Sequence, residues 1–296
     1  MNLIGEIAAL AAAFMWAGSS FIFTAASIKI GPIQLNVDRM ILAGVLLCLS
    51  LLVTGIGFAI STEQLVYLSL SGFVGLVLGD SFLFRSFKEI GPRVSMLLLS
   101  SNPALAAVLA YLFLDEGLNL TGILGISVTL FGIAIVILEK PKVPNGGFNI
   151  TLKGVIFGFL SAAGQGSGLI FAKLAFQSGD IHSITATFYR IITAVIILMP
   201  LAAFANRYKN PFKLYIESRK TFLNVFAGSF IGPYLGITLF FVAIIYTKVC
   251  IASTIMATVP IIMLPLSAII YTEKLTLRAI IGAFIAFGGV AVLFLI

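Results

Sequence analysis

Long apolar runs separated by short polar stretches dominate the pattern of the chain. Eight runs contain no charged residue and cover residues 7–28, 40–62, 94–114, 117–138, 154–172, 221–247, 249–272 and 279–296. Two further apolar runs, 64–87 and 183–204, contain charges. A helix of about 20 apolar residues crosses the ~30 Å hydrocarbon layer of a bilayer. Because the runs are continuously apolar and do not alternate, they predict ten transmembrane helices and not the strands of a barrel.

The composition supports an all-α integral membrane protein and excludes several other classes. Of the 296 residues, 60% are hydrophobic and 10% are charged, whereas soluble domains carry about 25% charged residues. Two cysteines within apolar runs and a single histidine indicate neither a disulfide framework nor a multi-histidine metal site. We therefore expect no metal and no cofactor. A net charge of +7 in so apolar a chain indicates loops at an anionic membrane surface, not a nucleic-acid partner.

Basic residues gather on one set of the predicted loops. Fifteen of the 18 Lys and Arg residues lie in or beside the loops that follow the odd-numbered helices. The positive-inside rule places these loops in the cytoplasm and both termini outside. We expect a multi-pass protein of a prokaryotic cytoplasmic membrane.

The second half of the chain repeats the first. A shift of 157 residues aligns residues 72–139 with 229–296 without a gap. Offsets of 149 and 151 residues pair Gly5 with Gly154 and Arg39 with Arg190. The chain therefore divides into a five-helix repeat over 1–140, a connecting loop over 141–152 and a second five-helix repeat over 153–296. Identities at the 157-residue offset include Gly75/Gly232, Gly79/Gly236, Phe84/Phe241, Pro103/Pro260, Glu116/Glu273, Gly125/Gly282 and Gly132/Gly289.

Five helices per repeat determine how the two repeats cross the membrane. Because five is odd, the second repeat enters the bilayer in the opposite orientation to the first. Inverted repeats are common in secondary transporters, whose substrate sites lie near the midplane between the repeats. The pattern predicts alternating access to a small-molecule substrate, with protons as a candidate coupling ion.

These residues also resemble a known family. The pattern is similar to the EamA-type proteins of the drug/metabolite transporter superfamily, which have two tandem repeats. The resemblance implies a ten-helix carrier of a small polar or amphipathic metabolite, such as an amino acid, and often an exporter. Cytoplasmic termini are often assigned in that superfamily, but we keep the orientation that the charges of this chain indicate. The matching positions are Gly79-Asp80, Phe84, Gly91, Asn102-Pro103, Leu114-Asp115-Glu116, Gly125 and Gly132, and then Pro260, Glu273, Gly282 and Gly289.

Asp80 is the sharpest candidate for contact with substrate. It lies within a predicted span, and its counterpart in the second repeat is Ile237. An ionisable group in hydrocarbon is costly and typically functional. Two interpretations stay open: Asp80 binds a substrate amine or a coupling proton, or it forms a structural ion pair with Arg85 or Lys88.

Polar and aromatic side chains within the spans, several of them beside the duplicated prolines, complete the predicted site. Because proline removes a backbone hydrogen bond, the helix before it can present a free carbonyl to a cavity. Ordinary hydrogen bonding between helices is the alternative for each residue. Besides Asp80, the candidates are Trp16, Ser20, Phe23, Phe84, Ser101, Asn102, Gln165, Ser167, Tyr189, Tyr234, Thr238, Thr254 and Thr258.

Three duplicated pairs are predicted to have gating or structural roles. They are Arg39/Arg190, Pro103/Pro260 and Glu116/Glu273. Duplication under inversion favours a role in the scaffold or in the gates over substrate contact, and carboxylates such as those of the glutamate pair favour helix N-termini.

Other functions are weaker alternatives. A proton-independent facilitator or a channel-like pore would use the same helices without coupling or switching. An enzyme would need a nucleophile and a base, or a metal, and the chain has one histidine and one carboxylate well inside a span. We therefore predict that the protein is not an enzyme.

Overall fold

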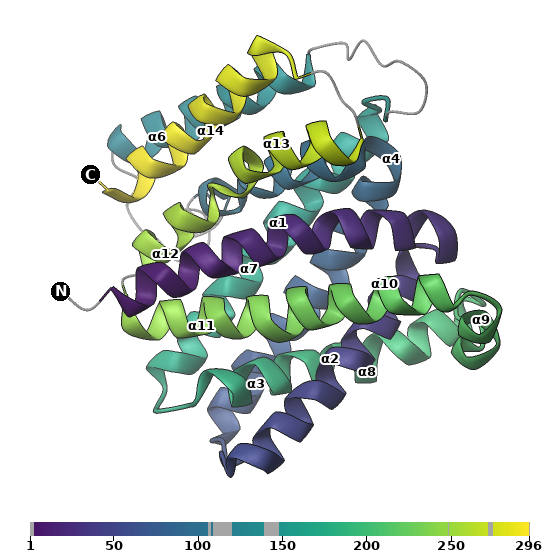
Figure 1. Ribbon diagram of the computed structural model, residues 1–296. Coiled ribbons are helices and arrows are strands. Elements are labelled where there is room, and N and C mark those ends of the chain that lie inside the picture. The colour runs from purple at the N-terminus through teal and green to yellow at the C-terminus, as the bar shows by residue number, and fades with distance from the viewer. Residues whose placement is uncertain are drawn as a thin grey trace.

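The computed structural model describes residues 3–105, 108, 120–138, 148–247, 249–271 and 275–295, and the regular structure of this part is helical (Figure 1). Glu116, Glu273 and residues 141–147 of the predicted connecting loop lie outside the described residues. The elements are α1 (Ile4–Ile30), α2 (Pro32–Thr54), α3 (Thr62–Ser71), the π-helix η1 (Gly72–Gly79), α4 (Asp80–Leu99), α6 (Leu120–Ile137), α7 (Leu152–Gln177), α8 (Ser183–Phe204), α9 (Pro211–Glu217), α10 (Arg219–Ser229), the π-helix η2 (Phe230–Gly236), α11 (Ile237–Tyr246), α12 (Val249–Met256), α13 (Val259–Ile270) and α14 (Leu277–Leu295).

The described helices match the ten predicted crossings, the fourth of them only as far as residue 105. Seven helical segments are long and apolar enough to span a membrane, and one of them, Thr62–Leu99, has 38 residues. The chain reverses within that segment, since the hydroxyls of Ser86 and Ser95, nine positions apart, lie within 2.7 Å. The shorter apolar helices Thr254–Ile270 and Leu277–Val292 supply the last two crossings. The chain is therefore a multi-pass membrane protein.

A Gly-Pro pair makes each of two tight turns between antiparallel helices. Gly31 joins α1 to α2 with φ of 91°, and Gly91 divides α4 with φ of 76°. A left-handed backbone carries little cost only for glycine. The prolines that follow, Pro32 and Pro92, suit the first turn of a helix, where no backbone donor is needed. These pairs explain how the chain turns back within one or two residues.

The two repeats run in opposite directions. Ser27 of α1 donates a hydrogen bond to the Phe84 carbonyl, so the C-terminal end of α1 lies beside the C-terminal half of the third crossing. In the second repeat, Gly154 at the start of α7 contacts Ile90, whereas Gly168 farther along contacts Gly75. The helix α7 is therefore antiparallel to the third crossing and to α1, as inverted repeats require (Figure 1).

Each repeat packs its first helix against the third crossing of the other repeat. Helix α1 lies along α10, η2 and α11, whereas α7 lies along α3, η1 and α4. Glycines permit both approaches. Gly75 and Gly79 of η1 face Gly168 and Gly164 of α7, and Gly232 of η2 faces Ser19 of α1. Small residues let helices approach closely where apolar burial alone gives little preference between protein and lipid.

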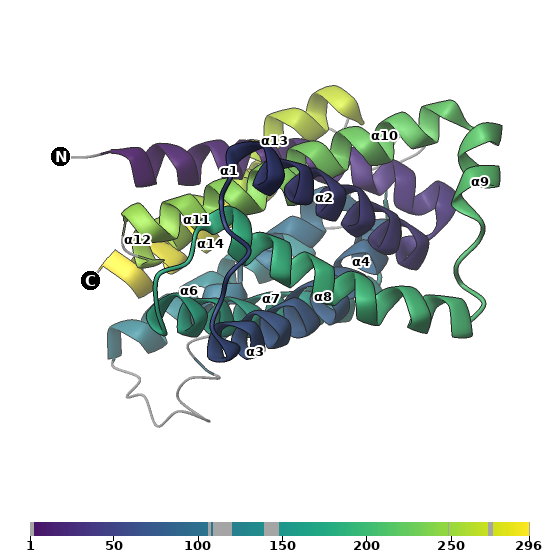
Figure 2. The ribbon, with the colours of Figure 1, turned by 90° about the horizontal axis from the view of Figure 1, so that it is seen from below.

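The loops that carry most of the basic residues share one end of the molecule. Lys29, beside the first turn, donates to Ser218 before α10 over 2.5 Å. At the same end the Phe148 ring packs on Tyr271 with centroids 5.8 Å apart and lies against Gly91. Both termini lie at the opposite end from α9 (Figures 1 and 2). The cytoplasmic location of the basic end remains a prediction from charge.

Candidate functional site

A cavity of about 120 Å³ lies between the two repeats. It is large enough for several water molecules or a small solute, since one water needs roughly 10–15 Å³ measured in this way. The lining is mostly apolar, with a few polar groups. The lining residues are Trp16, Leu76, Met96, Leu99, Ser100, Asn102, Pro103, Gln165, Leu169, Arg190, Ile237, Phe240, Met256, Ala257 and Val259.

Equivalent positions of the two repeats line the cavity together. The 157-residue offset relates Leu99 to Met256 and Ser100 to Ala257, and the 149-residue offset relates Trp16 to Gln165. The cavity therefore lies where the two inverted repeats meet, which is the usual place of a substrate site in transporters with this architecture.

Both repeats break a helix at this cavity. The amide of Ser101 bonds the Leu98 carbonyl, and the amide of Ala257 bonds the Thr254 carbonyl, each over 3.1 Å. These three-residue turns replace the regular α-helical bonds just before Pro103 and Pro260. Loosened backbone of this kind is tolerated at membrane depth where it is covered by protein or lines a cavity.

A π-helix precedes the position of Asp80 in the first repeat and of Ile237 in the second. The amide of Asp80 bonds the Gly75 carbonyl, and the amide of Ile237 bonds the Gly232 carbonyl, so both close five-residue turns. Such widened turns are rare and frequently occur at functional sites. The sequence pattern does not predict these widened turns, and their one visible signal in it is the pair of duplicated glycines, Gly75/Gly232 and Gly79/Gly236.

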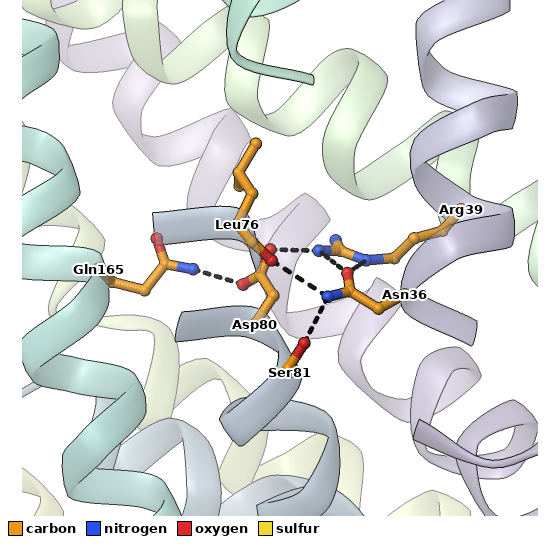
Figure 3. A network of polar contacts seen from close by, with 6 residues as sticks. All are labelled: Asn36, Arg39, Leu76, Asp80, Ser81 and Gln165. Atoms are coloured by element: carbon orange, nitrogen blue, oxygen red, sulfur yellow. Dashed lines mark hydrogen bonds and ion pairs between the residues drawn. The ribbon is translucent and has the colours of Figure 1, made fainter. Parts of the chain in front are cut away.

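Asp80 is fully buried in a polar network between helices (Figure 3). Its carboxylate forms an ion pair with Arg39 and accepts a hydrogen bond from the Gln165 amide. Asn36 orders the pair: its Oδ1 accepts from Arg39 over 3.0–3.1 Å, and its Nδ2 donates to the Leu76 carbonyl over 3.1 Å. Asp80 itself does not line the cavity, whereas its hydrogen-bond partner Gln165 does.

The ion-pair partner of Asp80 is neither Arg85 nor Lys88, the two partners that the sequence suggests, but Arg39. Arg85 and Lys88 follow Asp80 on its own helix, whereas the observed partner, Arg39, comes from α2. The guanidinium carbon of Arg39 lies 4.5 Å from the Phe84 ring centre and 5.5 Å from that of Phe23. Both predicted aromatic candidates thus pack against the arginine, which gains cation–π stabilisation in a dry environment.

Arg190 faces the cavity from α8. Its side chain is 5% exposed, and its guanidinium carbon lies 5.1 Å from the centre of the Phe241 ring. Its Nε atom is buried and has no hydrogen-bond acceptor among the described residues. The duplicated arginines therefore have different environments, although both were predicted as gating or structural residues.

Apart from Phe23, Asp80, Phe84 and Arg39, which form the network described above, the structure places the predicted site residues that it describes in three groups. Trp16, Asn102, Gln165, Pro103 and Arg190 line the cavity. The second group forms hydrogen bonds away from the cavity. In this group, Tyr189 donates to the Phe58 carbonyl and Tyr234 shares a hydrogen bond with the Ser50 hydroxyl. The hydroxyls that donate to carbonyls of their own segments are those of Ser20, Ser101, Ser167, Thr238 and Thr258. Thr254 and Pro260 are buried within the broken ninth crossing.

Most apolar lining residues were not predicted. Leu76, Met96, Met256 and Phe240 look like any other apolar residue of a span. The side of a helix that faces a cavity has no distinct signal when neighbouring sides face lipid or other apolar helices.

Two inverted five-helix repeats around a central cavity define a class of membrane protein, and sequence comparison then identifies the family. The model of the EamA-like transporter family matches residues 3–138 and 152–295, so the chain belongs to that family.

Curated relatives match part of the chain. An uncharacterized transporter of Archaeoglobus fulgidus is 27% identical over 126 residues, which are 42% of this chain and 43% of that protein. A WAT1-related protein of Arabidopsis thaliana is 29% identical over 130 residues, or 42% of this chain and 35% of that protein. The matches thus span less than half the length of these relatives. A solved crystal structure aligns with a TM-score of 0.67 at 17% identity, covering 98% of this chain and 96% of that chain.

Proposed function

We propose that the protein is a secondary transporter that moves a small polar or amphipathic metabolite by alternating access, in the direction of export. The cavity between inverted repeats, lined by equivalent positions of both, is the observation that carries this proposal. Two opposed halves can rock about a shared site, so that it opens to one side of the membrane at a time.

The broken helices beside the cavity are suitable gates. The turns at Ser101 and Ala257 each follow a regular helical segment and precede a proline. A helix is easier to bend where its hydrogen-bond ladder is already interrupted. Movement there can open or close the cavity without breaking additional backbone bonds.

Exchange in liposomes tests the function. The purified protein, reconstituted and preloaded with an unlabelled metabolite from a panel of amino acids, nucleosides and sugar phosphates, should accumulate the same labelled metabolite by saturable exchange. A bulky residue in the cavity, Asn102→Trp, should reduce exchange about tenfold or more, since the site itself is filled. The matched control Leu124→Trp, on the exposed face of α6, should retain it. Flux that rises linearly with concentration and shows no exchange would favour the channel-like pore, and no flux of any metabolite would contradict transport.

Asp80 is the candidate for proton coupling within this proposal. Replacing it with Asn keeps the size and the acceptor for Arg39 but removes the charge and the exchangeable proton. If protons drive transport through Asp80, then Asp80→Asn should abolish uptake driven by a pH gradient while exchange at equal pH continues. Gradient-driven uptake equal to that of the unmodified protein would remove this role and favour the proton-independent facilitator.

A further inference from the structure

Arg190 and Arg39 are equivalent by the internal repeat, but only one of them has a carboxylate partner. Each stacks on the aromatic ring at the corresponding position of its own repeat, Phe84 for Arg39 and Phe241 for Arg190. Arg39 also pairs with Asp80. The residue at the position of Asp80 in the second repeat is Ile237, which lines the cavity.

The second repeat therefore has the arginine and the aromatic ring but lacks the anion. A guanidinium stays protonated in proteins and offers five donors in a planar fork. An uncompensated charge at membrane depth is costly, so buried arginines pair with an anion, a carbonyl or water. Arg190 is 5% exposed, its Nε lacks an acceptor, and it borders an open volume of about 120 Å³.

Neither buried aspartate of the described helices, Asp80 or Asp38, forms an ion pair with Arg190. Asp80 attracts Arg190 electrostatically, but its carboxylate accepts its hydrogen bonds from Arg39 and Gln165. Asp38, which is also buried, accepts from Gln34 and from the hydroxyls of Tyr208 and Tyr215 near the loop end of α2.

We propose that Arg190 is the anion-binding residue of the cavity and that the solute is a small monocarboxylate, whose carboxyl group supplies the charge that Ile237 does not. The proposal rests on the proposed function and names the class of its substrate. Two arginines and one aspartate leave one positive charge at the site, which a single carboxylate neutralises. A phosphate ester with two negative charges would leave an excess negative charge, and a simple amine would add a second positive charge.

The remaining lining residues indicate what the rest of the solute looks like. Trp16, Leu76, Met96 and Met256 form an apolar surface for a hydrocarbon or aromatic body. Asn102 offers both a donor and an acceptor for one additional polar group. Gly75 leaves room for the guanidinium group of Arg190, since a Cβ atom at this position would lie 3.2 Å from Arg190 Nη2.

Ligand-induced stabilisation of the purified protein tests the proposal without any transport assay. The probes are butyrate, isovalerate and benzoate, each compared with its amide, together with butylamine and inorganic phosphate in a buffer free of carboxylates. At least one carboxylate should raise the melting temperature in a saturable manner, because a ligand that binds the folded state stabilises it. Its amide, the amine and phosphate should not.

Variants then locate the bound carboxylate. Arg190→Gln should weaken carboxylate affinity about tenfold or more, and Arg190→Lys, which keeps the charge but not the fork, should fall in between. The control Lys153→Gln removes one positive charge at an exposed site and should bind as the unmodified protein does. Equal stabilisation by amide and carboxylate, no stabilisation by any carboxylate, or unchanged affinity in Arg190→Gln would overturn the proposal.

The two proposals fail in different ways. Carboxylate binding that depends on Arg190, without exchange in liposomes, would contradict transport and leave the anion site intact. Exchange of a neutral or cationic metabolite, without carboxylate binding, would leave transport intact and contradict the anion site.

Discussion

Replacing Asp80 with alanine will lower the melting temperature of the purified protein by about 10 °C. The change leaves Arg39, which is 0% exposed, without its ion-pair partner in the interior. Removing one member of a buried pair costs about 3–5 kcal/mol, because the remaining charge stays desolvated and uncompensated. For a protein of this size each 1 kcal/mol corresponds to roughly 2–4 °C. Thermal unfolding in detergent, monitored by tryptophan fluorescence or light scattering, measures the shift.

Two controls separate the buried charge from a general loss of packing. The double variant Arg39→Met with Asp80→Leu should recover most of the lost stability, since it removes both charges and keeps apolar volume. Glu89→Ala breaks the partly exposed pair with Lys153, whose atoms are 3.8 Å apart, and should shift the melting temperature by no more than about 2 °C. A single variant at Asp80 as stable as Glu89→Ala would mean that the network in Figure 3 does not hold the helices together.

The second large effect is expected at Gly289, where α14 packs on α6. A Cβ atom built there would overlap the backbone amide of Thr129, and that backbone cannot move aside without displacing the helix. Overpacking of this kind costs about 1–3 kcal/mol, so Gly289→Ala should lower the melting temperature by about 5 °C.

The neighbouring glycine provides a matched control. Gly288 lies on the same helix, and a Cβ atom built there meets nothing within 4 Å. Gly288→Ala should be neutral or slightly stabilising, because alanine is the better helix former by roughly 1 kcal/mol. Equal effects at the two positions would show that helix propensity, not the close approach of α6 and α14, decides stability here.

The polar network and the cavity together explain why the duplicated arginines differ. Asp80 ties α2 to the third crossing, and through Gln165 it also reaches α7 of the other repeat. The arginine of the first repeat thus pairs with a carboxylate, although its Nη1 atom has no acceptor among the described residues, whereas Arg190 of the second repeat borders the cavity without an ion-pair partner in the described part of the chain. If the proposed function holds, this asymmetry would give the solute one defined orientation in the cavity.

Part of the site could be predicted from the sequence. Trp16, Asn102 and Gln165 line the cavity, and all three are polar or amphipathic residues that interrupt apolar spans. Arg190 lies inside an apolar span, but its equivalence to Arg39 predicts a gating or structural role for both arginines. The sequence repeat does not show that Arg39 has a carboxylate partner and Arg190 has none among the described residues. The hydroxyl residues were less informative: five of the candidates bond carbonyls of their own segments, as Ser and Thr commonly do in membrane helices.

The sequence by itself determined the ten crossings, the duplication and the opposite orientation of the repeats. These properties follow from the length of apolar runs, from spacing along the chain and from an odd helix count, all of which are one-dimensional. Only the tertiary structure decided that Asp80 pairs with Arg39, 41 residues away, and that Ile237 faces the cavity. The physical reason is that helices apolar on all sides do not encode their rotation about their own axes, which the packing of glycines and buried charges between neighbouring helices sets.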